Sequence, residues 1–296
     1  MSTNSISRAR TIIVKVLAIL IAAILAILVH AALPQTVNVE QFDSALVKLF
    51  GFPVVAAFYF VLLFTHCAVM ISLFGAKANI RNSQIGIRFG ISFAVIYLAG
   101  MQEVVVEASP FSTWGLDFVK YQLVMGVGDA IPVLLLCLFV ALFTLDRKDR
   151  PVSVLEYKNH NGLKVVAVIA ISFLIERAIG YETGMISSNC DTYPIQTYAW
   201  TLLFGMALGY VYLMLYPIFA SISRTVFINF KISVLTIGIN WIIFNSFIGL
   251  IFNGALAQTL LRSGVDVVVL LLATIITNKY LHTGLRRRND LNSSLH

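Results

Sequence analysis

Residues 11–33 read TIIVKVLAILIAAILAILVHAAL, an apolar run that only two ionisable groups, Lys15 and His30, interrupt. As a helix rising 1.5 Å per residue, the run covers about 35 Å, more than the hydrocarbon thickness of about 30 Å. A signal peptide has a shorter apolar run of about 7–15 residues, so we expect an uncleaved anchor, with cleavage after Ala31 as the alternative. This stretch predicts that the chain crosses a membrane.

Similar apolar stretches recur along the chain. Seven are long enough to cross a membrane as helices, and they lie at Thr11–Leu33, Phe52–Ala76, Ile85–Met101, Phe118–Leu145, Tyr198–Ala220, Ile232–Phe252 and Val265–His282. Overall, 59% of the residues are hydrophobic and 12% are charged, against about 25% charged in a soluble domain, and the mean hydropathy is +0.88. This composition excludes soluble enzymes, DNA-binding proteins and secreted disulfide-rich proteins.

The segment Lys164–Ile186 decides the number of spans. Its uninterrupted apolar run, Val165–Ile175, is too short to cross unless Glu176 and Arg177 also lie within the membrane. With this segment as an eighth span and both termini cytoplasmic, 17 of the 21 Lys and Arg residues fall on the inner side, as the positive-inside rule requires. We therefore predict an all-α bundle of eight transmembrane helices, a single domain over residues 1–296 without a soluble domain.

The net charge of +7 follows from this topology and from attraction to the cytoplasmic leaflet, so no nucleic-acid partner is expected. The expected location is a prokaryotic plasma (inner) membrane, with the lipid bilayer as partner. Acidic residues gather in the predicted outer segments, and these are Glu40, Asp43, Glu107, Asp117, Glu182, Asp191 and Asp266.

Polar residues on five spans fall at a similar depth, about 18–25 Å from the inner end of each helix. They are His30, Glu103, Asp129, Glu176, Arg177 and Asn245. Ionisable groups inside a bilayer are costly and usually mark a pathway or a binding site, so this polar layer in the outer half of the membrane is the candidate substrate site. Alternatively, the layer is structural, because the spans end early or the charges only fix helix packing.

Arg177 needs a partner on another helix, because Glu176 points about 100° away from it around the helix. We expect that partner to be Asp129, because a short inner loop should make the fourth and fifth spans antiparallel neighbours. Glu103 is the second choice.

The fourth span has an unusual centre, Gly126-Val-Gly128-Asp129-Ala-Ile-Pro132. Pro132 cannot donate a backbone hydrogen bond and should kink the helix, and the two glycines allow another backbone or a substrate to approach closely. The stretch resembles the Gly-x-Gly-Asp signature of intramembrane aspartyl proteases, the presenilin and signal-peptide-peptidase family. That resemblance implies that Asp129 activates water together with a second aspartate, but the preceding span has none.

Cys190, in the outer loop before the sixth span, is loosely similar in its placement to the cysteine of exosortase-type transpeptidases. That resemblance implies an Arg and a His after it on the outer side. Arg262 fits the first, but no outer His follows. His30 and His66 have no second His one helical turn away, so no metal or other cofactor is predicted.

Three classes of function are compatible with these observations. The preferred one is a transporter, exporter or lipid flippase with a small-molecule, lipid or peptide substrate. The second is an integral-membrane enzyme that uses Asp129, Glu103 or Glu176 as acid or base. The third is a non-catalytic membrane subunit, or an immunity or assembly factor, in which the charges only hold helices together.

Overall fold

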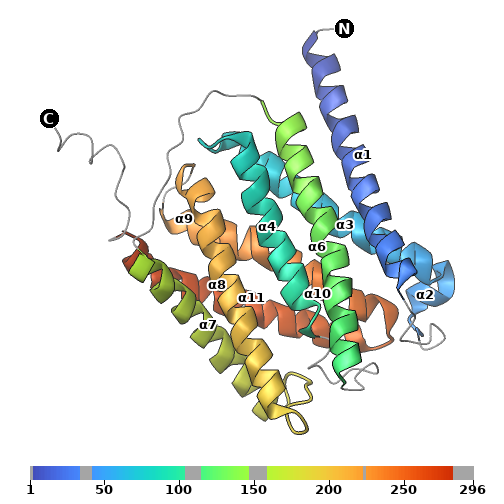
Figure 1. Ribbon diagram of the computed structural model, residues 1–296, viewed down its shortest axis with the longest axis vertical. Coiled ribbons are helices and arrows are strands. Elements are labelled where there is room, and N and C mark those ends of the chain that lie inside the picture. The colour runs from blue at the N-terminus through green and yellow to red at the C-terminus, as the bar shows by residue number, and fades with distance from the viewer. Residues whose placement is uncertain (1–2, 34–41, 104–114, 147–158, 223–224, 283–296) are drawn as a thin grey trace, which may run out of the picture.

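The computed structural model describes residues 3–33, 42–103, 115–146, 159–222 and 225–282, and these form a bundle of helices (Figure 1). The elements are α1 (Thr3–Ala32), α2 (Ala45–Phe50), α3 (Phe52–Phe74) with the short η2 (Gly75–Lys77), α4 (Asn82–Gly100), α6 (Leu116–Thr144), α7 (Asn159–Glu182), α8 (Pro194–Ala220), α9 (Thr225–Asn229), η3 (Phe230–Gly238), α10 (Ile239–Ile251) and α11 (Ala255–His282). α9, η3 and α10 follow one another without a gap, and η3 is a π-helix. The described residues contain no strand.

Seven helices in the described part of the chain are long and apolar enough to cross a membrane. They span Ala9–Ala32, Phe52–Lys77, Asn82–Gly100, Leu116–Thr144, Pro194–Ala220, Phe227–Ile251 and Ala255–Asn278. Apolar side chains also remain on the outside of the bundle, such as Ile21 on α1, which is 58% exposed, as expected for a surface that faces lipid. The prediction of an all-helical fold with several helices that can cross a membrane is confirmed. α7 is not among the seven, and the eighth span and the cytoplasmic termini stay predictions.

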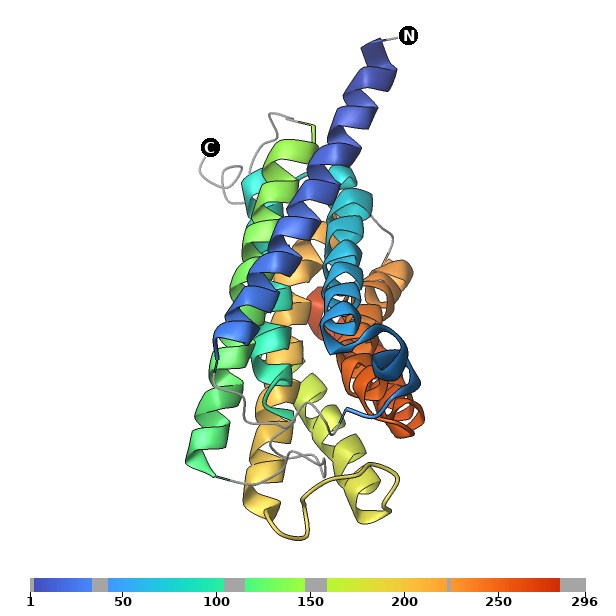
Figure 2. The same ribbon diagram turned by 90° about the vertical axis from the view of Figure 1, so that its right-hand side faces the viewer.

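The helices form two layers that cross at an angle. α1, α6, α4 and α8 lie side by side, and α3, α10 and α11 pass behind them (Figure 1); Figure 2 shows both layers from the side. α4 packs between α6 and α8, and α1 packs against α6 and α3. α7 packs against α8 and α11, so it joins the two layers at one end of the bundle.

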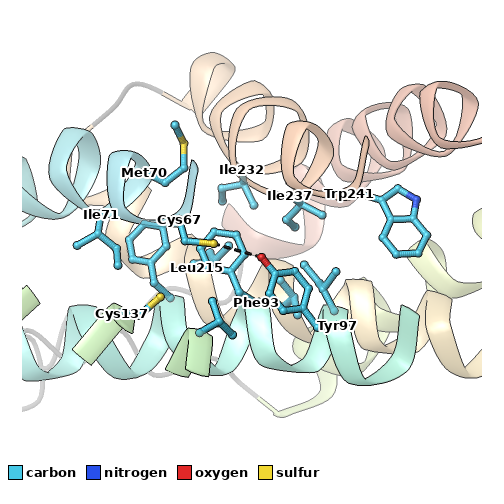
Figure 3. Close-up of a cluster of buried hydrophobic side chains, with 14 of the residues drawn as sticks. Cys67, Met70, Ile71, Phe93, Tyr97, Cys137, Leu215, Ile232, Ile237 and Trp241 are labelled. Carbon is cyan, nitrogen blue, oxygen red and sulfur yellow. Dashed lines mark hydrogen bonds between the residues drawn. The ribbon is translucent and has the colours of Figure 1, made fainter. Parts of the chain in front are cut away.

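A hydrophobic core fills the space between the layers. Phe93 and Tyr97 of α4 face Cys67 of α3 and Ile237 of η3, and the Cys67 thiol lies 3.3 Å from the Tyr97 hydroxyl (Figure 3). Aromatic rings continue the core toward α10, where Tyr97 and Phe244 stack with their centroids 5.4 Å apart. These contacts hold α10 at a fixed position relative to α4.

Close helix pairs depend on glycine at the point of contact. A Cβ on Gly205 of α8 would come within 2.9 Å of the Ala170 Cα on α7, and one on Gly209 would come within 2.8 Å of the Val166 Cα. The sequence Gly205–Gly209 is a GxxxG pattern, which lets two helix backbones approach closely in a membrane. It fixes α7 against α8 and so determines where Arg177 enters the bundle.

The glycines of the fourth span serve packing as well. A Cβ on Gly126 would lie 3.1 Å from the Leu98 Cα on α4, and one on Gly128 would lie 2.7 Å from Val29 Cγ1 on α1. α6 continues through Pro132 as one helix, and the kink expected there stays a prediction. We expected these glycines to make room for another backbone or for a substrate. In the structure, neighbouring helices occupy that space.

Candidate functional site

Arg177 is the centre of a buried group of charges. Its side chain, 1% exposed, extends from α7 toward α11, where Nε donates to Asp266 Oδ1 at 2.8 Å and Nη2 donates to Oδ2 at 2.7 Å. Nη1 lies 2.8 Å from Glu103 Oε1. A two-pronged contact of this kind is the strongest geometry between arginine and a carboxylate. The guanidinium also lies 5.1 Å from the centre of the Phe173 ring, which adds a cation–π contact.

A second arginine contacts one of the same carboxylates. Arg262 of α11 lies with Nε 3.4 Å from Glu103 Oε1, and its Nη2 donates to Asn245 Oδ1 at 2.8 Å. The tight turn between α10 and α11, in which Gly254 has a φ of +79°, sets Asn245 opposite Arg262. Trp241 of α10 donates its indole N–H to Asp266 Oδ2 at 2.8 Å.

Glu176 is the third carboxylate of the group and differs from the other two. It is 8% exposed, and Oε2 lies 3.7 Å from Arg177 Nε. Neither of its carboxylate oxygens accepts a hydrogen bond from the described residues. We call Glu103, Glu176, Arg177, Arg262 and Asp266, together with Trp241 and Asn245, the Arg177 cluster.

The helix ends place these side chains. α4 ends at Gly100, and Glu103 follows within one turn. Trp200 of α8 donates to the Ala99 carbonyl at 3.0 Å and fixes this end of α4 close to α8. α7 ends at Glu182, followed by Gly184 with a φ of +70°, a conformation that glycine adopts without strain.

Asp129 belongs to a separate pair. Its Oδ1 lies 2.8 Å from His30 Nε2 on α1, and Oδ2 has no hydrogen-bond partner among the described residues. The prediction that Arg177 pairs with Asp129 is therefore wrong, whereas the second choice, Glu103, is confirmed. Asp129 also pairs with a histidine rather than with a second aspartate, so the two-aspartate arrangement implied by the aspartyl-protease resemblance is not formed by this contact.

The physical reason for the wrong pairing is helix order. α6 packs against α4, α1 and α3, whereas α7 packs against α8 and α11, and the two lie far apart in Figure 1. Residues 147–158 connect them and lie outside the described residues, but a chain of that length can reach roughly 40 Å when extended. Connection length alone therefore does not make α6 and α7 neighbours.

The predicted polar layer divides into two groups. Four of its six residues, Glu103, Glu176, Arg177 and Asn245, come together in the Arg177 cluster. The other two, His30 and Asp129, form their own pair.

Sequence reasoning missed Asp266, Arg262 and Trp241. Asp266 was grouped with the outer acids because it lies at the outer end of the predicted last span, Val265–His282, and Arg262 was expected outside that span. In fact α11 begins at Ala255, and both residues lie within it, each 2% exposed. The spacing of Thr259, Arg262, Ser263 and Asp266 was the signal, because residues three and four apart share one face of a helix. Two other acids from the same expectation, Glu40 and Glu107, lie outside the described residues.

A smaller polar network surrounds the π-helix. His66 of α3 lies with Nε2 3.0 Å from the Leu235 carbonyl, and Asn240 Nδ2 lies 3.2 Å from His66 Nδ1 and 3.5 Å from Cys67 Sγ. This geometry suits a neutral imidazole with its proton on Nε2. In the described residues, no three His, Cys, Asp or Glu side chains are grouped in a way that could hold a metal ion.

The chain was compared with models of protein families, with curated proteins and with solved structures, and none of the three comparisons found a match.

Proposed function

We propose that the protein is a membrane transporter, exporter or lipid flippase whose polar site is the Arg177 cluster. The observation that carries the proposal is the cluster itself: five charged side chains, each less than 9% exposed, inside a bundle whose outer surface is apolar. Each charge in such a position costs at least roughly 2–3 kcal/mol on insertion scales. One structural ion pair would fix the helices, so five charges favour a role in moving a polar or charged substrate.

The proposed topology has eight crossings, with α7 as the fifth and both termini cytoplasmic. α7 has 24 residues, or about 36 Å of helix, which is sufficient to span. Its Glu176 and Arg177 lower its hydropathy but are buried against other helices rather than facing lipid. The bias of Lys and Arg to one side supports the same topology, and a plasma (inner) membrane is the location that we propose.

A cysteine provides a direct test of this topology. Cys190 follows α7 and is half-buried, whereas Cys67 and Cys137 are fully buried. With α7 as a span, a membrane-impermeant maleimide added to intact cells should label Cys190, and the Cys190→Ser variant should remain unlabelled. Labelling of Cys190 only after the cells are opened would place this loop inside and contradict the eight-span topology.

Polar side chains continue from the cluster along one pair of helices, which supports a pathway. The buried polar residues of α9–η3–α10 are Asn229, Ser233, Thr236, Asn240 and Asn245, and those of α11 are Thr259, Arg262, Ser263, Asp266, Thr274 and Thr277. Ser233 and Thr274 hydrogen-bond across this interface at 3.0 Å. In contrast, the buried face of α3 carries no charged or amide side chain. Broken helices and polar seams of this kind are typical of transporter sites.

The test is transport by the purified full-length chain in liposomes. The probes are a fluorescent phospholipid for flipping and radiolabelled amino acids, dipeptides and sugars for uptake. We expect activity toward at least one class, its loss in Asp266→Asn, and its retention in the matched control Glu182→Gln, whose carboxylate lies on α7 but is exposed and accepts from Tyr198.

Two outcomes would contradict the proposal. Equal activity in Asp266→Asn and wild type would show that the cluster is not the transport site. Failure of every probe, combined with loss of Asp266→Asn from the membrane, would favour the non-catalytic subunit.

A further inference from the structure

The Arg177 cluster contains one more acid than base. Its three carboxylates, Glu103, Glu176 and Asp266, face two guanidiniums, Arg177 and Arg262. Arginine stays protonated in proteins, so the described part of the cluster carries one net negative charge when every acid is ionised. An uncompensated buried charge is strongly unfavourable, and such a site normally takes up a proton or a cation to become neutral.

Contacts within the cluster single out one carboxylate. Asp266 accepts three N–H donors, two from Arg177 and one from Trp241, and Glu103 lies against both arginines at 2.8 and 3.4 Å. Glu176 has only the Arg177 Nε at 3.7 Å, and its oxygens accept no hydrogen bond from the described residues. Hydrogen bonds to a carboxylate favour its charged form. Of the three acids, Glu176 is therefore the one whose charged form its neighbours stabilise least.

The geometry suits a proton better than a metal cation. A metal ion needs several oxygen ligands in a shell, but Asp266 already accepts three N–H donors, from Arg177 and Trp241. A protonated Glu176 needs only one acceptor for its O–H, and Asp266 Oδ1, which accepts from Arg177 Nε alone, has a lone pair left for it. Tyr181, on the next turn of α7, already shares a hydrogen bond with Thr201 of α8 at 3.1 Å.

We propose that Glu176 is a proton-binding site and that the proton it takes up and releases couples transport to a proton gradient. The coupling rests on the function proposed above, whereas proton binding does not. One O–H bond forms on a Glu176 carboxylate oxygen when a proton arrives from water, and the same bond breaks when that proton returns to water on the other side. No oxidant, reductant or further reactant is required.

Infrared spectroscopy tests proton binding without any substrate. The full-length protein in lipid nanodiscs is measured near neutral pH, where a protonated carboxylic acid gives a carbonyl stretch that a carboxylate lacks. We expect this band in wild type and in Glu182→Gln, and we expect Glu176→Gln to lose it. An unchanged band in a folded Glu176→Gln, or no such band in wild type, would overturn the proposal.

Isotope labelling covers the case in which Glu176→Gln does not fold. In wild type grown with ¹³C-carboxyl glutamate, the band should shift to lower frequency, because the protonated group is a glutamate. A band that does not shift would assign the proton to an aspartate, such as Asp129, whose Oδ2 has no hydrogen-bond partner among the described residues, and would overturn the assignment to Glu176.

Liposome measurements separate the two proposals. A transported probe whose uptake follows an imposed pH gradient in wild type, but not in Glu176→Gln, supports coupling. Uptake that ignores the gradient would overturn coupling and leave the transport function standing. The infrared band without any transport would keep the proton site and reject the transporter.

Discussion

The Arg177 cluster surrounds two guanidiniums with three carboxylates, whereas the His30–Asp129 pair sets one imidazole against one carboxylate. Arg177 is 1% exposed, but the His30 side chain is 21% exposed at the end of α1. Because a guanidinium cannot lose its charge inside a protein, each buried arginine of the cluster needs a carboxylate close to it. An imidazole can be neutral, so the His30–Asp129 pair can exist without a full positive charge. The two regions therefore differ in how far the fold depends on them.

The largest expected effect is that of Arg177→Ala. The substitution leaves Asp266 and Glu103 buried with one guanidinium fewer, and removal of one partner from a buried ion pair costs roughly 3–5 kcal/mol. Unfolding in detergent micelles measures this loss. The control is Lys120→Ala, whose ion pair with Asp117 is exposed and is worth about 0–1 kcal/mol. Equal losses in the two variants would show that the cluster does not hold the fold.

A pair of double variants tests which acid is the partner of Arg177. Arg177→Met with Asp266→Leu removes both members of the closest ion pair and should recover roughly 2 kcal/mol or more of the loss, because apolar replacement of a buried pair is often neutral. Arg177→Met with Asp129→Leu leaves Asp266 unmatched and should recover nothing. The opposite order of stability in the same unfolding experiment would restore Asp129 as the partner.

The smallest expected effect is that of Asp129→Asn. The amide keeps an acceptor for His30 Nε2, so the loss should be about 1 kcal/mol, the net value of a typical hydrogen bond. The abundance of the variant in the membrane should match that of wild type, as measured by quantitative blotting of membrane fractions. A loss as large as that of Arg177→Ala would remove the difference between the two regions.

Hydropathy predicted the spans well because the bilayer imposes one length on every helix. The second span was expected at Phe52–Ala76 and is found at Phe52–Lys77, and the sixth was expected to end at Ala220, where α8 ends. The last span was wrong at its beginning: it was expected from Val265, whereas α11 begins at Ala255, because Arg262 made the first turns of a buried helix look like a loop. Charges that pair inside the bundle lower the hydropathy of a segment without removing it from the membrane.

The partners of the buried charges could not be predicted in the same way. Counting residues from the end of a span gives the depth of Asp129 and Arg177, but it does not give the direction in which either side chain points. Direction depends on which helices pack together, and contacts such as Gly205 against Ala170 decide that. Glu103 was identified because it lies at the right depth. Asp266 was missed because a span that begins at Val265 places it at the outer boundary, whereas it lies in the fourth turn of α11.

The order of synthesis gives the Arg177–Asp266 pair a further consequence. Asp266 lies 89 residues after Arg177, so synthesis makes α7 long before α11 exists. During that interval Glu103 is the partner already made, and α7 is not among the helices that are apolar enough to cross a membrane by themselves. With α7 as the proposed fifth span, a nascent chain that stops before α11 should hold α7 loosely, and completion of α11 should fix it in place.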